Sequence, residues 1–304
     1  MIVTETKLEL PLHTRGKVRD VYELGDYLLI VASDRISAFD HVLPTPIPDK
    51  GAILTRLSNF WFEWLKDITR NHIVETEVEK MAERVDVPVW KKVIKENARL
   101  LEGRTVLVKK LRRVNIECVV RGYLAGSGWK EYGKYGSVCG IELPEKMEES
   151  GKISQPIFTP STKSGKGAHD INITEEQMID NVGYELGKKL KENSIRLYMK
   201  ACEYAIKKGI IIADTKFEFG VHNSDEGIVL IDEALTPDSS RFWDKDKYAV
   251  GRSQDSYDKQ FVRDYLLSIK WNQEPPIPEL PGDVVKKTKE KYLQAYSRIT
   301  GKNF

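Results

Sequence analysis

The sequence predicts an α+β protein with two lobes: a β-rich lobe over residues 1–114 and a mixed α/β lobe over residues 115–304. Three observations support this prediction. Short β-rich runs dominate the first part of the chain, helical and strand patterns alternate after it, and 304 residues suit one large domain or two smaller ones. The chain is therefore long enough to bury a substantial core.

The N-terminal lobe is expected to begin with a hairpin. Residues 16–32 contain two β-rich runs around a glycine-aspartate turn signal, and the first run carries Lys17 and Arg19 on one face. Apolar residues recur at three- and four-residue spacing over residues 52–68, which predicts a helix packed on a core. A further strand is expected at residues 105–111.

The mixed lobe is expected to open with a strand at residues 116–121 and a glycine-rich stretch at residues 122–140. A helical pattern then runs over residues 174–208 and ends before a glycine, a natural stop signal. Thr174 and Gln177 have the spacing of a capping box. We therefore expect one long helix that starts at Thr174.

The last third of the chain should contain two strands and then two helices. The strands are expected at residues 209–220 and 227–235, on either side of a polar turn. A helix is expected near residues 257–269, followed by a proline-rich connector at residues 275–281 and a last helix that ends near Gly301.

Composition excludes several functions. Lys and Arg number 48 against 46 Asp and Glu, a net charge of +2, so neither nucleic acid nor an acidic membrane is the expected partner. The longest apolar runs fall far short of the roughly 20 residues that a membrane span needs, and the N-terminus does not resemble a secretory signal. We expect a cytoplasmic protein whose cysteines, Cys118, Cys139 and Cys202, are reduced and mostly buried.

Several catalytic motifs are missing from the sequence. Gly165-Lys166 is followed by glycine where a Walker loop needs Ser or Thr, and Pro160 occupies its first glycine position. The two Gly-x-Gly pairs lack the third glycine of a dinucleotide fingerprint. The five histidines have no paired zinc spacing, and no Gly-x-Ser-x-Gly motif occurs.

The strongest chemical signal is a strand with an acid-base-acid face. Alternation places Asp214, Lys216 and Glu218 on one face and apolar residues on the other. The next strand adds Asp232, whose carboxylate is costly among apolar neighbours unless a cation satisfies it. Glu218 and Asp232 could hold Mg²⁺ through hard oxygen ligands. The alternative is a salt-bridged solvent face of a hairpin.

Other polar segments each allow two interpretations. Residues 33–40, SDRISAFD, follow the first hairpin as a ligand-binding loop or as a turn with local hydrogen bonds. Lys17 and Arg19 could simply be solvated on an edge strand. The basic residues 109–113 are better explained as a charged strand end than as a nucleic-acid patch.

Two arginines are candidates for anion binding. Arg121 precedes residues 122–128, whose small side chains allow a phosphate to approach the backbone. Arg241 lies in a turn at residues 237–243. An ordinary glycine loop is the alternative for each of them.

Taken together, these segments resemble one family. They read GKVRDVYE, SDRISAFD, IPDKGAILTRLSNFWF, ECVVRGYLAGSGWKEY, FTPSTKSGKGAHD, ADTKFEFG, LIDEALTPDSSRFW and SYDKQFVRDYL. In this order, from Gly16 to the C-terminus, they resemble the phosphoribosylaminoimidazole-succinocarboxamide synthase (SAICAR synthetase) family, in its longer bacterial and fungal form. The resemblance implies a two-lobed fold related to protein kinases and ATP-grasp enzymes. It also implies a ligase of purine biosynthesis that joins L-aspartate to carboxyaminoimidazole ribonucleotide with ATP and Mg²⁺.

The resemblance assigns two groups of site residues. For ATP and its metal, it implies these: Lys17, Arg19, Lys109, Glu117, Glu218 and Asp232, with Asp40 near the metals. For the ribonucleotide and the reaction, it implies these: Arg121, Ser127, Arg241, Ser37, Asp40, Asp214 and Lys216. The segment of residues 151–170 is expected to order over bound substrates as a lid.

The chemistry agrees with these residue types. A carboxylate does not react with an amine at neutral pH, so ATP must first convert it to an acyl phosphate, and no protein nucleophile is needed. Two alternatives differ in class. Another phosphotransferase of kinase-like fold is disfavoured because no His-Arg-Asp loop is present and Glu-Ala follows Asp232. A nucleotide-binding regulator would bind ligands without turnover.

Overall fold

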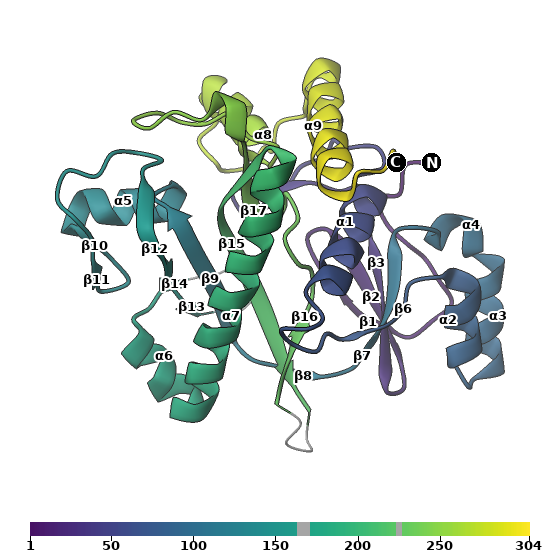
Figure 1. Cartoon of the computed structure of the whole chain (residues 1–304). Coiled ribbons are helices and arrows are strands. Elements are labelled where there is room, and N and C mark those ends of the chain that lie inside the picture. Colours follow the sequence, from purple (N-terminus) through teal and green to yellow (C-terminus); the bar gives the residue numbers. More distant parts are fainter. Residues whose placement is uncertain (163–170, 223–226) are drawn as a thin grey trace. The chain divides into compact units, whose positions relative to one another are not determined.

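A computed structural model describes residues 1–162, 171–222 and 227–304, and divides the chain into two compact units (Figure 1). The first unit comprises residues 1–60, 72–110 and 257–304, and the second comprises residues 61–71 and 111–256. The C-terminal helices thus belong to the first unit, although they follow the second in the chain. Both units combine helices with antiparallel sheets, as expected for an α+β protein.

A five-stranded antiparallel sheet with the order β1-β2-β3-β7-β6 forms the centre of the first unit. Its strands and those of a small second sheet are β1 (Leu12–Arg15), β2 (Arg19–Leu24), β3 (Tyr27–Ala32), β6 (Ile73–Glu75), β7 (Thr105–Lys109), β4 (Ser37–Ala38) and β5 (His41–Val42). The predicted hairpin is confirmed as β2 and β3. However, β2 begins at Arg19, so Lys17 lies in the bend before this strand and not on it.

The helices of the first unit come from three parts of the chain. They are α1 (Lys50–Trp64, in this unit as far as Phe60), α2 (Val78–Arg84), α3 (Pro88–Glu96), α4 (Ala98–Leu101), α8 (Gln260–Ser268) and α9 (Gly282–Thr300). The predicted helices at the start and end of this set are confirmed as α1, α8 and α9. Short helices α2 to α4 occupy a region for which the sequence analysis made no prediction.

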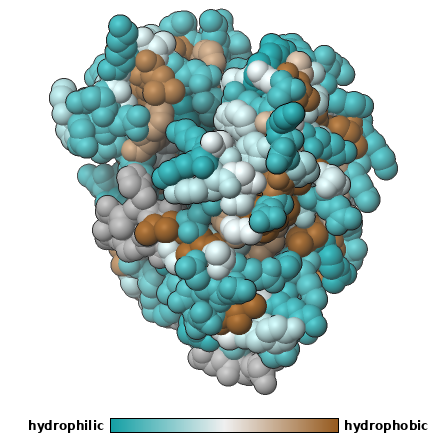
Figure 2. All heavy atoms as spheres, turned by 90° about the vertical axis from the view of Figure 1, so that its left-hand side faces the viewer, coloured by the Kyte–Doolittle hydropathy of each residue, from teal (hydrophilic) through white to brown (hydrophobic). Residues whose placement is uncertain are grey.

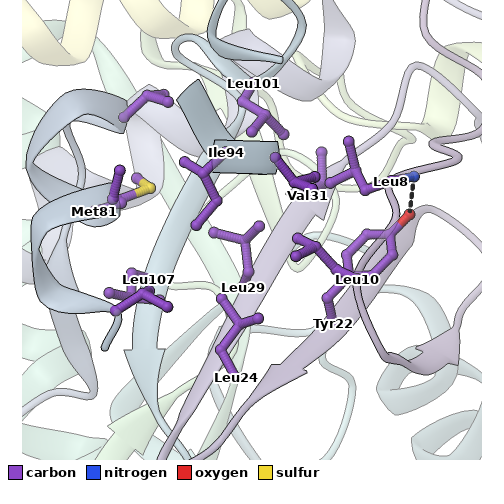
Figure 3. Close-up of a cluster of buried hydrophobic side chains, with 14 residues drawn as sticks. Leu8, Leu10, Tyr22, Leu24, Leu29, Val31, Met81, Ile94, Leu101 and Leu107 are labelled. Atoms are coloured by element: carbon purple, nitrogen blue, oxygen red, sulfur yellow. Dashed lines mark hydrogen bonds between the residues drawn. The ribbon is translucent and has the colours of Figure 1, made fainter. Parts of the chain in front are cut away.

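One face of the five-stranded sheet carries a hydrophobic core (Figure 3). Alternating residues of β2 and β3, among them Leu24, Leu29 and Val31, point into it and meet Met81 and Ile94 from α2 and α3. Full burial of each such side chain contributes roughly 1.5–3 kcal/mol. This packing holds the hairpin that follows Lys17 in a fixed position within its unit.

Two buried carboxylates tie the N-terminal segment to the same unit. Asp20 accepts hydrogen bonds from the Thr6 backbone N–H (2.7 Å) and hydroxyl (2.8 Å), while Asp34 accepts from the Val3 N–H (2.8 Å). Burial raises the pKa of Asp20, but the Thr6 hydrogen bonds and the Arg35 guanidinium outweigh it and lower that pKa below its usual value. Residues 1–6 therefore form an integral part of the unit.

An antiparallel sheet of eight strands forms the second unit, with the order β14-β13-β9-β15-β16 and with β12, β17 and β8 paired beside this path. Its strands and a separate small pair are β8 (Arg112–Arg113), β9 (Ile116–Tyr123), β12 (Lys152–Phe158), β13 (Ser161–Thr162), β14 (Ile171–Asn172), β15 (Ile210–Val221), β16 (Ile228–Ile231), β17 (Ser240–Asp244), β10 (Ser137–Val138) and β11 (Ile141–Glu142). The predicted strands at residues 116–121 and 209–220 are confirmed as β9 and β15.

Helices of the second unit differ from the sequence prediction in two places. They are α5 (Gly126–Tyr135), α6 (Glu175–Val182), α7 (Tyr184–Ala205) and the 3₁₀ turns η1 (Ile206–Lys208) and η2 (Lys245–Lys247). The capping box of Thr174 and Gln177 is confirmed at the start of α6. The expected single helix is divided at Gly183, whose φ of 86° is not helical. Conversely, α5 lies inside the glycine-rich stretch, where we expected a loop.

The described residues contain no helix that is long and apolar enough to cross a membrane. Figure 2 shows a face that is mostly hydrophilic, with hydrophobic side chains in small separate groups. The three cysteines are free thiols, with Cys118 and Cys139 buried and Cys202 partly buried. The burial of Cys118 and Cys139 agrees with the prediction from composition.

Candidate active site

Asp214 is the centre of a charged cluster in the second unit. It lies on β15 and is paired in register with Arg121 of β9 on one side and with Arg241 of β17 on the other. Its Oδ2 atom accepts hydrogen bonds from Arg121 (3.2 Å) and from Arg241 (2.6 Å). The structure thus brings together three residues that the sequence analysis assigned to the ribonucleotide.

Arg121 is buried, and each of its three side-chain nitrogens donates one hydrogen bond within this cluster, which leaves two of its five N–H groups for a ligand. Its Nε donates to the Thr159 hydroxyl (3.0 Å) and its second terminal nitrogen donates to the Ser127 hydroxyl (3.1 Å). Burial lowers the pKa of Arg121 from its usual value, while the carboxylate of Asp214 acts in the opposite direction. Because an arginine stays charged in proteins, a permanent buried cation results. Sequence reasoning missed Thr159, which directly follows β12, since nothing in the sequence distinguishes it from other threonines.

The N-terminus of α5 lies beside the two arginines. Its N-cap residue is Ala125, which offers no side-chain hydrogen bond to the first N–H groups of the helix. A Cβ atom at Gly126 would overlap the guanidinium of Arg241, and one at Gly128 would lie 3.2 Å from Cδ of Arg121. Glycine is therefore required at position 126 because the Arg241 guanidinium approaches the backbone there.

These features together define an anion site. Helix N-termini attract anions through their N–H groups and the helix dipole. Two arginine forks add charge and planar hydrogen bonds that match a phosphate. The Ser127 hydroxyl, predicted for this role, lies within the first turn of α5 and next to Arg121. We conclude that the second unit can hold a phosphate group at this place.

A second group of polar residues follows on the same two strands. Alternation places Lys216 and Glu218 on the face of β15 that carries Asp214. Lys216 Nζ donates to Oε1 of Glu117 on β9 (2.9 Å), so two residues with different predicted roles form one ion pair. The Glu117 side chain is buried, while that of Lys216 is partly exposed. Lys216 can therefore reach a ligand while its carboxylate partner stays fixed.

Glu218 and Asp232 are neighbours through strand pairing. Glu218 is paired with Ile231, the last residue of β16, and Asp232 follows directly. The predicted strand ends before Asp232, which has a φ of 69° and is therefore in a turn. Both side chains provide the hard oxygen ligands that Mg²⁺ prefers. Within the described parts of the chain, no group of three or more potential ligands is close enough to hold a metal by itself.

The remaining predicted residues lie in the first unit. Lys17 and Asp40 form an ion pair, with about half of each side chain exposed. Arg35 of the SDRISAFD segment donates to the carbonyl oxygens of Gly16 and Lys17 (3.0 Å each) and so fixes the backbone of this bend. Asp34 of the same segment is structural, since it is buried against Arg104 (2.9 Å).

Three further predicted residues of this unit occupy ordinary strand positions. Arg19 begins β2 opposite Ala32, Ser37 lies on the short strand β4, and Lys109 ends β7 with an exposed side chain. In the expected lid, most of the described part is strand and not loop, since it forms β12 and β13, while residues 163–170 lie outside the described residues. The binding roles of Arg19, Ser37 and Lys109 therefore stay predictions.

Comparisons with known proteins identify the family. The fold and the anion site define a mixed α/β protein equipped to bind a phosphorylated small molecule. The chain belongs to the SAICAR synthetase family, whose model matches residues 12–278. It is 55% identical over 300 residues to a phosphoribosylaminoimidazole-succinocarboxamide synthase of Thermodesulfovibrio yellowstonii, covering 98% of this chain and 99% of the relative. A relative of the same name from Geobacter metallireducens is 52% identical over 294 residues, covering 97% of this chain and 96% of the relative.

Solved structures agree with this assignment. A structure described as SAICAR synthase has a TM-score of 0.89 and 45% identity, covering 99% of both chains. The SAICAR synthase from Saccharomyces cerevisiae, complexed with SAICAR, has a TM-score of 0.87 at the same identity and coverage. The resemblance stated from the sequence is therefore confirmed.

Proposed function

We propose that the chain is an ATP-dependent ligase that joins L-aspartate to carboxyaminoimidazole ribonucleotide through an amide bond, with release of ADP and phosphate. The observation that carries this proposal is similarity at 55% identity over 98% of the chain to a protein named for this activity. The reaction would belong to purine biosynthesis in the cytoplasm and involve only small molecules. The proposal includes a relationship of the fold to protein kinases and ATP-grasp enzymes. In that relationship the β-rich lobe of residues 1–114 would cover ATP.

The ribonucleotide phosphate would bind at the anion site. Arg121, Arg241 and Ser127 would contact its oxygens together with the first N–H groups of α5. The yeast relative is complexed with SAICAR, which supports a ribonucleotide as the ligand. The assignment of its phosphate to this place rests on the two arginines and the N-terminus of α5. Asp214 would act mainly through the arginines, because its Oδ2 already accepts a hydrogen bond from each of them.

The ATP-binding residues of the proposal are those that the sequence resemblance assigned to it. Lys17 and Arg19 would contact its phosphates, Lys109 and Glu117 would lie near its base, and Ser37 would lie near the ribonucleotide. Glu218 and Asp232 carry oxygen ligands of the kind that Mg²⁺ prefers, and Asp40 is the third carboxylate that the family resemblance assigns to the metal. When bound, this ion would neutralise charge on the transferred phosphoryl group.

Lys216 would support the reaction itself. A carboxylate oxygen of the ribonucleotide attacks the γ-phosphorus of ATP, which forms an acyl phosphate and ADP. The aspartate amine then attacks the carbonyl carbon, loses a proton and expels phosphate as the C–N bond forms. The Lys216 ammonium group, oriented by Glu117, would stabilise the developing negative charge.

Heavy oxygen in the ribonucleotide carboxylate tests this mechanism. Because the bridging oxygen leaves with phosphorus, the released phosphate should contain one labelled oxygen, as measured by mass spectrometry. Steady-state release of ADP should require both the ribonucleotide and aspartate, because the enzyme turns over only when the amine consumes the acyl phosphate. Unlabelled phosphate beside normal amide formation would refute the acyl phosphate, and ligand binding without any turnover would refute the ligase.

A further inference from the structure

The backbone of β15 is irregular beside Asp214. The pairing of β15 with β17 shifts between Ile212 and Asp214, which leaves Ala213 as the extra residue of a β-bulge. A bulge interrupts the ladder and redirects the side chain that follows it. In this protein the redirected side chain is the carboxylate to which both arginines bind.

Tyr198 of α7 supplies the hydrogen bond that the bulge requires. Its hydroxyl donates to the Ile212 carbonyl (2.7 Å) and lies 3.3 Å from the Ala213 carbonyl. The Cys202 thiol also approaches Ile212, but at 3.8 Å, and a thiol is a weak donor. The Tyr198 side chain is almost fully buried. A buried carbonyl without a donor is costly, so this hydroxyl stabilises the bulged conformation.

Gly122 of β9 makes room for this contact. A Cβ atom at Gly122 would overlap the Tyr198 hydroxyl, so the tyrosine reaches the bulge only because this residue has no side chain. Gly122 follows Arg121 on the strand, so the two residues face opposite sides of the sheet. Tyr198 therefore acts from the side covered by α7 (Figure 1), while Arg121 and Asp214 lie on the other side.

We propose that Tyr198 is a positioning residue for the ribonucleotide site. It holds the bulge at Ala213, which aims Asp214 so that one carboxylate oxygen holds Arg121 and Arg241 together. The inference rests on the proposed function, because it takes these arginines to bind the ribonucleotide phosphate. Tyr198 itself touches neither the substrate nor the reacting atoms.

Steady-state kinetics of Tyr198→Phe test the proposal. The KM for the ribonucleotide should rise about three- to tenfold, the usual effect of one lost hydrogen bond in a buried network, with the KM for ATP and kcat changed less than about twofold. Tyr22→Phe is the matched control, since its buried hydroxyl also donates to a backbone carbonyl, that of Thr6 in the first unit (2.9 Å). The control should lose similar thermal stability without any change in KM. An unchanged ribonucleotide KM in Tyr198→Phe, or an equal rise in the control, would overturn the proposal.

A double-mutant cycle gives a second test that does not depend on one variant. Gly122→Ala should displace the tyrosine and raise the same KM. In the Tyr198→Phe background the added Cβ would meet ring carbons at 3.1 and 3.3 Å, a conflict that a small shift relieves. The two changes should therefore be strongly non-additive. If the effects of Gly122→Ala and Tyr198→Phe on the ribonucleotide KM were additive, their contact would not be the cause of the change.

The ligand assignment is tested separately with Arg241→Ala. If this variant binds the ribonucleotide normally, the assignment of the phosphate site fails. If it loses affinity while Tyr198→Phe does not, only the positioning role fails.

Discussion

The charged cluster around Asp214 and the Lys17–Asp40 pair combine the same kinds of groups in opposite surroundings. The side chains of Arg121 and Asp214 are 4% and 6% exposed, while those of Lys17 and Asp40 are 52% and 54% exposed. A buried pair is costly to break because one charge is left without compensation, whereas an exposed pair is screened by water. The free energy of unfolding should therefore depend strongly on the charged cluster in the second unit. Loss of the Lys17–Asp40 pair in the first unit should affect turnover but not stability.

The largest effect is expected for Arg121→Ala. Removal of this guanidinium leaves Thr159 and Ser127 without their donor and Asp214 with a single arginine. We expect a loss of about 3–5 kcal/mol in the free energy of unfolding, measured by urea denaturation. Arg112→Ala, on an exposed position of β8 in the same unit, should change it by less than about 0.5 kcal/mol. Equal free energies of unfolding for the two variants would show that the buried cluster stabilises the protein no more than an exposed arginine does.

Lys17→Met should show the opposite behaviour. The substitution keeps an unbranched apolar side chain and leaves Asp40 in solvent, so the free energy of unfolding should change by less than about 0.5 kcal/mol. Turnover should nevertheless fall about a hundredfold or more if Lys17 contacts the ATP phosphates as proposed, because a cation beside the transferred phosphoryl group would then be lost. ADP release and urea denaturation measure the two quantities on the same sample. A Lys17→Met protein with lower stability but normal turnover would show that the exposed pair, like the buried cluster, serves stability.

Arg241→Ala should have an intermediate effect. Its side chain is partly exposed, and Asp214 keeps Arg121 when it is removed, so stability should change little. The ribonucleotide should bind about 1.5–3 kcal/mol more weakly, while ATP binding is unchanged. Titration calorimetry with each ligand in turn measures this. Equal weakening of both ligands would exclude the proposed phosphate site.

Thiol labelling provides the smallest and most local signal. All three cysteines belong to the second unit, and burial raises the pKa of Cys139 and of Cys202 to about 12 each. At pH 8 only about one such thiol in ten thousand is ionised, so native labelling should be slow. Arg121→Ala should accelerate it a few-fold, and Lys17→Met should leave the rate unchanged. Faster labelling in the lysine variant would show that the exposed pair also supports the second unit.

The sequence predicted local features better than contacts between strands. Alternation placed Asp214, Lys216 and Glu218 on one face, and Thr174 with Gln177 correctly marked a helix start. By contrast, the contact of Arg121 with Asp214 joins residues 93 positions apart and depends on strand register. Periodicity carries no information about register between distant strands.

Two further differences have local physical causes. The break at Gly183 depends on a positive φ that helical periodicity does not reveal, since apolar spacing continues across it. Helix α5 was missed because Gly126 and Gly128 look like loop residues, although they are small to accommodate two arginine side chains. In both cases the residue is glycine, and its role, a helix break or room for an arginine, depends on backbone conformation and spatial neighbours that the sequence does not show.

The anchoring of the first six residues has a practical consequence for protein engineering. Trimming the chain to begin near Gly16, where the family resemblance starts, would strip Asp20 and Asp34 of hydrogen-bond donors supplied by Thr6 and Val3. Such a shortened protein should be less stable than the full chain at neutral pH, and the difference should shrink as the pH falls and Asp20 is protonated, because protonation removes the charge that lost its donors. Purification tags should accordingly extend outward from Met1, which is exposed, and leave the following residues intact.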